Sequence, residues 1–178
     1  MKQSELDPCV FYWHHEGVLE GCISLHVDDM VIGGTDRFHQ MVLGPLKQRY
    51  PFKHWKIGGG MFLGKQLKQN EDFSIFCDQK EYAEKVQTIK LTKDRRKQKH
   101  EFITESERRK LRGVVGAANW MMGNTRPVIA VCNAFLQQRI QCATVSDLIE
   151  ANKLVAKIRD FHMCVFGSNL FPFMRASC

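Results

Sequence analysis

The sequence predicts an α+β protein in which a β-rich first half is followed by a bundle of about three helices. Up to residue 77 the apolar runs are short and lie between turn-forming residues, which is typical of hairpins. Beyond Asp78 the apolar residues recur at helical spacing, and two capping boxes, Thr104 with Glu107 and Thr144 with Asp147, indicate helix starts. With 178 residues, 44% of them hydrophobic, the chain is long enough for one domain or two small subdomains with a core.

Three strands are expected near the N-terminus. Cys9 to Trp13 is apolar and aromatic, and a turn at His15 to Gly17 separates it from a β-rich run at Val18 to His26. Met30 to Ile32 continues the β pattern, and Gly33-Gly34 ends it. The flanks CISL and MVI are apolar without alternation, which predicts a strand pair covered on both faces.

A helix and a second hairpin are expected next. Thr35 can cap a helix through Phe38 and Leu46, which Gly44-Pro45 should kink or break. The runs MFLGKQL and FSIFC, separated by Gln69 to Asp72, predict a hairpin. Gly59 to Lys65 has the spacing of a phosphate-binding P-loop, but the next residue is Gln where Ser or Thr would bind magnesium, which favours a glycine-rich turn entering a strand.

The remaining chain is expected to be helical. A short helix from about Asp78 to Ile89 leads into a basic segment, and Pro127 suits the first turn of a later helix. The three later helices are expected to carry apolar residues as follows: Leu111, Val114, Val115 and Ala118; Val131, Phe135 and Leu136; and Leu148, Ala151, Val155 and Ile158.

The formal charge of +7 is concentrated between Lys90 and Arg112, where basic residues far outnumber acidic ones. One interpretation is a solvated charged linker. The other is a surface for a nucleic-acid backbone, because a cationic segment favours polyanions whatever their sequence. The residues expected to bind nucleic acid in this segment are Lys90, Lys93, Arg95, Arg96, Lys97, Lys99, Arg108, Arg109 and Arg112.

The composition of the chain also indicates in which cellular compartment the protein is expected. No stretch approaches the roughly 20 apolar residues of a membrane helix, and the N-terminal MKQSELDPC lacks the apolar core of a signal peptide. We therefore expect an intracellular protein, cytoplasmic or nuclear, that is not secreted and has no membrane partner. The seven cysteines show no disulfide-framework spacing, so reduced thiols are expected.

Several zinc-ligand residue types lie close together near the start of the chain. Their spacing is poor for a structural site, because Cys9 and His14 would stand about 16 Å apart on one extended strand. Ordinary strand residues are therefore the alternative to a zinc module. The residues concerned are Cys9, His14, His15, Cys22 and His26.

Asp28 and Asp29 stand side by side within SLHVDDMVIGG. An isolated Asp-Asp in a turn is usually solvated, but here apolar strands flank the pair on both sides. Carboxylates at the end of such a strand pair are held rigidly beside a core, which suits binding of Mg²⁺ through oxygen ligands. We expect both residues to lie at or beside the tip of a β-hairpin.

The order apolar strand, Asp-Asp, apolar strand resembles the catalytic hairpin of reverse transcriptases. The blocks SELDPCVFYW, SLHVDDMVIGG, FLGKQL, QKEYAEKV and LRGVVGAANWMMGNTRPVIAV resemble, in order, the C-terminal half of copia-type retrotransposon reverse transcriptases. They span about residues 4 to 155. The ordered set, with Asp-Pro-Cys before the dyad and Thr-Arg-Pro after it, is far more specific than the dyad alone.

The resemblance implies a domain organisation. Residues 1–88 would be a partial polymerase palm with the catalytic-type hairpin and, at Met61 to Cys77, a primer-grip-like hairpin. Residues 89–160 would be a basic connector and a helical thumb. The likeness ends at Phe161, and residues 161–178 are expected to be a truncated tail.

The resemblance also implies the chemistry. The family's palm performs RNA-directed DNA synthesis with two Mg²⁺ ions, which activate the primer 3′ hydroxyl and stabilise the leaving pyrophosphate. Asp28 and Asp29 match the catalytic, metal-binding carboxylates, and His26 stands where the family usually has a tyrosine near the primer terminus. A third Asp of the family lies on an earlier palm strand, a setting that Asp7, Glu16 and Glu20 do not share. Mg²⁺ is thus expected for the complete enzyme and is expected to be weak or absent in this chain.

The partner implied by the resemblance is nucleic acid, an RNA–DNA hybrid or a DNA duplex held by the thumb, together with the fingers and the remaining palm segment. The leading expectation is therefore a reverse-transcriptase fragment that is inactive alone. A non-catalytic nucleic-acid-binding remnant and a zinc-stabilised interaction module are the alternatives.

Overall fold

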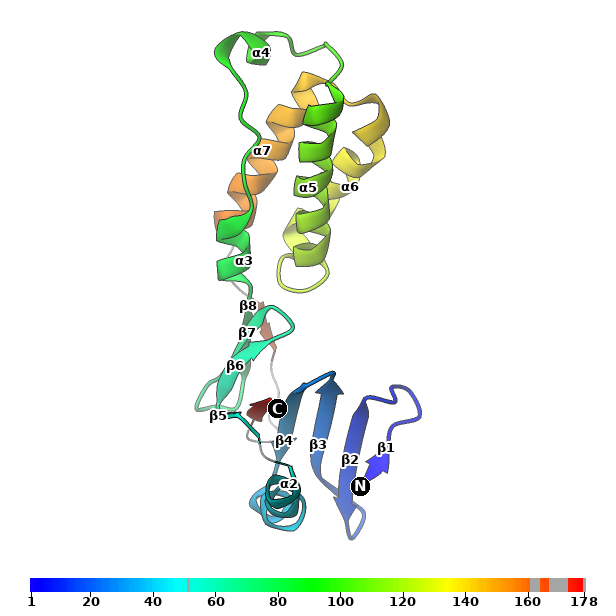
Figure 1. The fold of residues 1–178 in the computed structure, drawn as a ribbon, viewed down its shortest axis with the longest axis vertical. Helices are drawn as coiled ribbons and strands as arrows, with labels where there is room; N and C mark the ends of the chain where they lie inside the picture. The colour runs from blue at the N-terminus through cyan, green and yellow to red at the C-terminus, as the bar shows by residue number, and fades with distance from the viewer. Residues whose placement is uncertain (51, 161–163, 167–172, 178) are drawn as a thin grey trace. The chain divides into compact units, whose positions relative to one another are not determined.

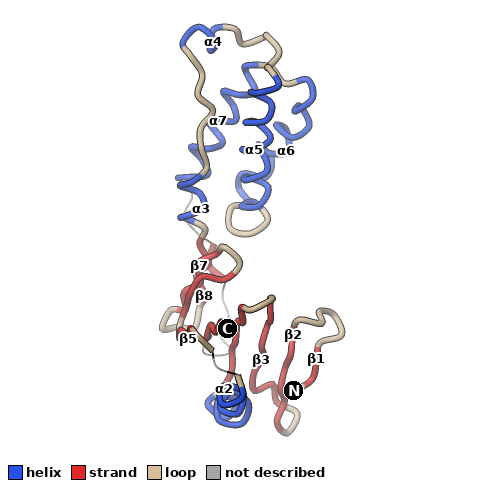
Figure 2. Tube along the Cα trace, viewed as in Figure 1, coloured by secondary structure: helices blue, strands red, loops and turns tan. Residues whose placement is uncertain are grey.

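The computed structural model describes residues 1–50, 52–160, 164–166 and 173–177 (Figures 1 and 2). Two compact units are present, one from residues 1–77 with 165–178 and one from 78–164. The first contains two antiparallel sheets and a helical segment, and the second is helical, so the α+β class is confirmed. The units divide earlier than the expected boundary after residue 88, because Ala83, Val86 and Ile89 are buried in the helical core.

The main sheet contains β1 (Lys2–Gln3), β2 (Val10–His15), β3 (Val18–His26), β4 (Asp29–Gly34), β10 (Phe173–Ser177) and β5 (His54–Ile57), in that spatial order (Figure 1). The pairs β2·β3 and β3·β4 are antiparallel, so the expected N-terminal strands form two hairpins. Part of the expected tail is strand β10, which pairs with both β4 and β5. Residues 161–163, 167–172 and 178 of that tail lie outside the described residues.

A glycine pair allows a helix to lie on this sheet. Gly21 of β3 and Gly34 of β4 are register partners, and a Cβ on either would overlap the ring of Phe38. That ring is fully buried and packs with Ile23 and Ile32 in the core of the unit. Glycine is therefore required at both positions by the close approach of an aromatic ring.

Burial along β4 alternates, which corrects the expectation of a strand pair covered on both faces. Met30, Ile32 and Gly34 are buried, whereas Asp29, Val31 and Gly33 are only half-buried. The apolar run is buried on one face only, because an antiparallel sheet tolerates Val31 and Gly33 on the face that the helical segment does not cover.

The helical segment begins where Thr35 predicts, with its Oγ1 accepting a hydrogen bond from the N–H of Phe38 at 3.3 Å. It runs as α1 (Asp36–Phe38), the π-helical turn η1 (His39–Leu43) and α2 (Gly44–Arg49). The disturbance expected at Gly44-Pro45 is this π turn rather than a helix end. The wider turn accommodates Pro45, which has no N–H to donate and whose ring crowds the preceding turn.

The second sheet contains β6 (Gly59–Phe62), β7 (Lys65–Gln69), β8 (Ile75–Asp78) and β9 (Cys164–Phe166). The run MFLGKQL, expected to be one strand, is divided between β6 and β7, which pair across a turn at Leu63-Gly64 with φ of 49° and 69°. Such a turn needs left-handed residues, and only the second of the two is a glycine. The expected turn between β7 and β8 is present, and the P-loop-like run is divided, with Gly59 and Gly60 in β6 and Gly64 in the turn.

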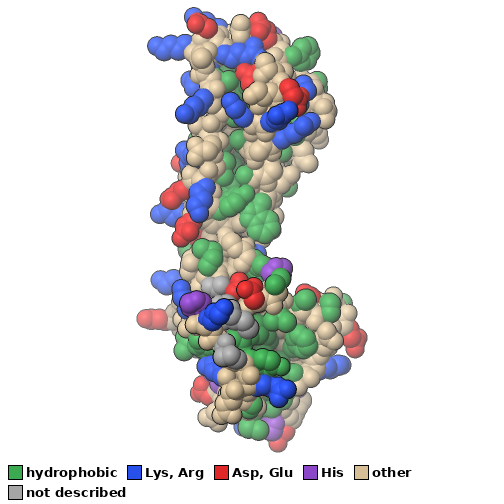
Figure 3. Space-filling view, viewed as in Figure 1, with side chains coloured by type: hydrophobic (Ala, Val, Ile, Leu, Met, Phe, Trp, Pro, Cys, Tyr) green, Lys and Arg blue, Asp and Glu red, His purple; other side chains and the backbone are tan. Residues whose placement is uncertain are grey.

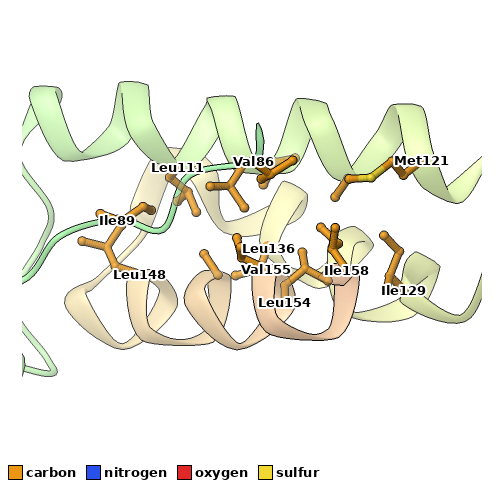
Figure 4. Packing of buried hydrophobic residues seen from close by; sticks show 14 of the residues in the cluster. Val86, Ile89, Leu111, Met121, Ile129, Leu136, Leu148, Leu154, Val155 and Ile158 are labelled. Carbon is orange, nitrogen blue, oxygen red and sulfur yellow. The ribbon is translucent and has the colours of Figure 1, made fainter. Parts of the chain in front are cut away.

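The helical unit contains α3 (Lys80–Lys85), α4 (Lys93–Lys97), α5 (Glu105–Met122), η2 (Pro127–Ile129), α6 (Ala130–Arg139), η3 (Ile140–Cys142) and α7 (Val145–Asp160). The Thr104–Glu107 capping box is complete, and Asp147 accepts from the N–H of Thr144 at 2.8 Å. Helices α5, α6 and α7 enclose an apolar core that Figure 4 shows. Helix α3 is shorter than expected, and the chain after it is extended.

The expected helix through Val131, Phe135 and Leu136 is α6, but only one of these three residues is buried. Leu136 is buried, but Val131 and Phe135 are 66% and 56% exposed. Their spacing alone does not distinguish them from Ile129 and Asn133, which face the core instead.

Gly34→Ala should lower the free energy of unfolding of the first unit by about 1–3 kcal/mol, because the added methyl must displace Phe38 from the sheet. Urea denaturation followed by tryptophan fluorescence measures this loss. Gly44→Ala is the control, since its Cβ would make only an ordinary contact with the carbonyl of His39. Equal stabilities of the two variants would show that the ring does not require glycine at 34.

Candidate functional site

The two aspartates lie at the tip of the β3·β4 hairpin, as the sequence predicts. His26 ends β3 and is paired with Asp29, the first residue of β4, so Val27 and Asp28 form the turn. Asp28 and His26 are exposed and Asp29 is half-buried. A tight two-residue connection fixes the backbone of the pair relative to both strands.

Val27 has a backbone conformation that a β-branched residue rarely adopts. Its φ is 55°, in the left-handed region that favours glycine, and its side chain is 85% exposed. Packing therefore does not explain the choice of valine. Strained backbone of this kind concentrates at functional sites, where surrounding structure holds it in place.

Asp29 lies on the sheet face opposite the helix-covered core. Alternation along β4 places it with Val31 and Gly33, away from buried Met30. On its other side the register partner of Asp29 is Ser177 of β10. The tip thus places a half-buried carboxylate on the sheet face opposite Met30, with strands on both sides.

The earlier acidic residues are engaged elsewhere. The carboxylate of Glu20 accepts from the hydroxyl of Thr35 and from Arg37, and Glu20 lies about 20 Å along β3 from the tip. Asp7 accepts from the N–H of Cys9 at 2.8 Å. Within the described part of the chain no three His, Cys, Asp or Glu residues form a metal-binding group, the proposed zinc-type residues included.

Arg95 is engaged within the helical unit. Its guanidinium donates to both carboxylate oxygens of Glu107, at 3.1 and 2.9 Å, to Glu101 at 2.9 Å and to the carbonyl of Phe102 at 3.0 Å. The hydrogen bond from Arg95 lowers the pKa of Glu107 from 4.5 to about 2, and the same contact raises the pKa of Arg95. Since Glu107 also caps α5 with Thr104, this guanidinium fastens the basic segment to the start of α5.

The other predicted cations fall into two groups. Arg108 donates to Glu105 at 2.9 Å and to the carbonyl of Gln141, Lys97 lies 3.1 Å from Asp94, and Arg112 lies 3.9 Å from Glu105. The second group is exposed and makes no ion pair within the described residues; it consists of Lys90, Lys93, Arg96, Lys99 and Arg109. Lys and Arg side chains gather over α4 and the start of α5 in Figure 3.

Helix α5 exposes residues that the sequence reasoning missed. Gly113 and Gly116 are exposed, and a Cβ added at either would meet no atom within 4 Å. Trp120, one turn further, is 42% exposed. At helical spacing these three share a face with Arg109. Glycine inside a strongly capped helical pattern is the signal that could have identified this face.

Comparison of the chain with protein-family models found no matching family, and neither the curated proteins nor the solved structures gave a match. Among the described helices, none combines the length and apolar character that crossing a membrane requires.

Acid should destabilise the helical unit through Glu107. Its folded-state pKa of about 2 lies below 4.5, so its pairing stabilises the fold above about pH 4.5 and is lost as the pH falls through about 2. Glu107→Gln should cost about 1 kcal/mol at neutral pH, allowing for solvent screening, and should flatten the pH dependence in that range. Denaturation as a function of pH measures both effects.

Glu84→Gln is the matched control for this test, because Glu84 is an exposed residue of the same unit with no ion pair among the described residues. A parent-like pH dependence in Glu107→Gln would show that the pair contributes nothing to stability.

Proposed function

We propose that the chain carries the catalytic-type hairpin and the thumb of a copia-type reverse transcriptase, and that its own activity is to bind a template–primer duplex. The observation that carries the proposal is the exposed face of α5, where two glycines and Trp120 lie beside Arg109. The ordered sequence blocks add the identity of the hairpin.

A helix face of this composition suits a duplex groove. Each exposed helical glycine costs about 1 kcal/mol relative to alanine, and neither Gly113 nor Gly116 has a neighbour that demands glycine. Without side chains the helix backbone can approach sugars and phosphates closely. Trp120 adds apolar contact with the sugar surface, and Arg109 and Arg112 supply contacts with phosphate oxygens.

The exposed cations before α5 extend this surface. Lys90, Lys93, Arg96 and Lys99 make no ion pair within the described residues, so their charges are available to phosphates. Arg95 supports them indirectly, because it anchors the segment that carries them. Contacts of this kind grip a backbone without reading its sequence, which suits a protein that binds any template.

The hairpin supports the polymerase part of the proposal. In the complete enzyme Asp28 and Asp29 would bind Mg²⁺ and be the catalytic residues, with His26 beside the primer terminus. A pair of ions about 3.5–4 Å apart needs enough negative charge to offset their repulsion. Asp7 and Glu20 are engaged by other groups, so we expect at most one weakly held Mg²⁺ in this chain.

A second candidate function is non-catalytic nucleic-acid binding, which the α5 face favours equally. The two functions differ in whether the hairpin can support synthesis once fingers and further palm residues from a related enzyme are supplied. Restored synthesis that requires Asp28 would favour the first function.

Changing Arg96, Lys99 and Arg109 together to glutamine should weaken binding of an RNA–DNA hybrid about tenfold or more. Each lost phosphate contact removes about 0.9 from the slope of log K against log salt, so the slope should flatten by about 2 to 3. Fluorescence anisotropy over a salt series measures both quantities.

The matched control changes Lys53, Lys56 and Lys68, three exposed lysines of the first unit, to glutamine. It removes the same charge and should retain more of the affinity. If the first variant kept the parent's affinity and slope, the basic segment would be only a solvated linker.

The purified chain should not extend a primed template with Mg²⁺, because among the described residues no third acidic side chain joins Asp28 and Asp29 in a metal-binding group. Primer extension with labelled nucleotides is the measurement, with Asp28→Asn as the control. Robust incorporation that Asp28→Asn abolishes would show that another acid completes the site.

A further inference from the structure

A groove of about 530 Å³ lies within the helical unit, between α5 and the extended segment that follows α3. Its floor is apolar, because Val86, Ile89 and Val114 are buried members of the helical core. Figure 4 labels the first two of these residues. The volume falls within the range of small-ligand pockets. A hollow of this size therefore offers an apolar surface to an occupant from outside the chain.

The wall formed by the extended segment is held in place from helix α7. The side-chain amide of Asn152 accepts from the N–H of Ile89 at 2.7 Å and donates to its carbonyl at 2.9 Å. Arg159 donates to the carbonyl of Val86 at 2.7 Å. Neither of these two side chains lines the groove, so the groove is preformed and its lining stays free for a ligand.

The rim of the groove is cationic. Lys85 and Lys90 stand on one side and Lys110 of α5 on the other, and all three are exposed without an ion pair among the described residues. Positive charge on both sides of an apolar floor calls for an occupant with a flat or apolar body and negative groups at its ends. The positive charge of the rim therefore favours an anionic ligand over a neutral one.

Three further lining residues suit an aromatic ring with polar edges. Tyr82 is 37% exposed and lines the groove, so its ring can stack on a planar group. Gln87 and Thr88 add exposed amide and hydroxyl groups, which can donate and accept hydrogen bonds.

We propose that this groove takes one unstacked base of a single-stranded nucleic acid, and that the three lysines contact the phosphates on either side of it. The proposal rests on the proposed nucleic-acid function and adds a site for an unpaired strand. Stacking on an aromatic side chain accepts any base, since every base has a π-face. Gln87 and Thr88 would meet its polar edge, which pairing hides in a duplex.

The test compares a labelled thymidylate hexamer with an abasic hexamer of equal charge on the full chain. Stacking of a base is worth roughly 5- to 100-fold in affinity, so the thymidylate strand should bind at least about fivefold tighter. A uridylate hexamer in parallel distinguishes DNA from RNA as the source of the base. Whichever of the thymidylate and uridylate hexamers binds with the higher affinity identifies the source of the base.

Variants then assign the difference to the groove. Tyr82→Ala should remove the preference for the base-containing strand while leaving abasic binding unchanged, and Tyr82→Phe should retain the preference. Tyr50→Ala removes an exposed tyrosine of the other unit and should have no effect. Changing Lys85, Lys90 and Lys110 to glutamine should weaken both strands about tenfold.

The outcomes separate this proposal from the one on which it rests. Equal binding of the two hexamers, or an unchanged preference in folded Tyr82→Ala, overturns the groove proposal even if duplex binding persists. Loss of all binding, duplex included, overturns both. A base preference that Tyr82→Phe retains and Tyr82→Ala loses supports the groove.

Discussion

The ring of Phe38, seated on the backbone of Gly21 and Gly34, determines which face of the main sheet becomes core. Because the helical segment is drawn against that face, the even-numbered positions of β4 are buried, and Asp29 is directed to the other face. A side chain at either glycine would lift the helix and remove the difference between the two faces. The position of the carboxylate therefore depends on two residues that carry no side chain and lie at the far end of the hairpin. Packing on one side of the sheet thus decides which residues of β4 lie on the other side.

In the helical unit, neighbouring residues of the same charge have different roles. Arg95 and Arg96 are adjacent on α4, and successive helical residues point about 100° apart. Arg95 consequently faces α5, where Glu107 holds it with two hydrogen bonds, while Arg96 faces solvent. A planar guanidinium carries five N–H donors in a fixed fork, so it can hold both oxygens of a carboxylate and a backbone carbonyl at once. The net charge of the segment thus overstates the positive charge that is exposed, because Arg95 is paired with Glu101 and Glu107 within the fold.

Features set by residues close in sequence were predictable, and those set by distant contacts were not. The capping of α5 by Thr104 and Glu107, the start at Thr35 and the hairpin tip at Asp28-Asp29 each depend on residues a few positions apart. The exposure of Val131 and Phe135 on α6 could not be predicted, because helical spacing gives a face but not its direction. The position of the extended segment after α3 depends on Asn152, far along the chain, which binds both the N–H and the carbonyl of Ile89. Arg95 was assigned to a ligand for the same reason, since its partner lies on another helix.

Two local features lower stability without serving the packing of the chain, and this bears on function. Val27 is exposed at a φ that suits glycine, and Gly116 is exposed in a helix where alanine would fit and stabilise. A sequence selected only for stability would have glycine at position 27 and a residue with a side chain, such as alanine, at position 116. Val27 presents a fixed side chain at a strained turn beside carboxylates, and Gly116 removes a side chain beside cations. Val27 keeps a side chain where backbone strain opposes one, and Gly116 has none where helix propensity favours one. Both choices change the surface of the protein and not its core. The hairpin tip and the α5 face are therefore two separate places on the surface where the sequence gives up local stability without a gain in packing.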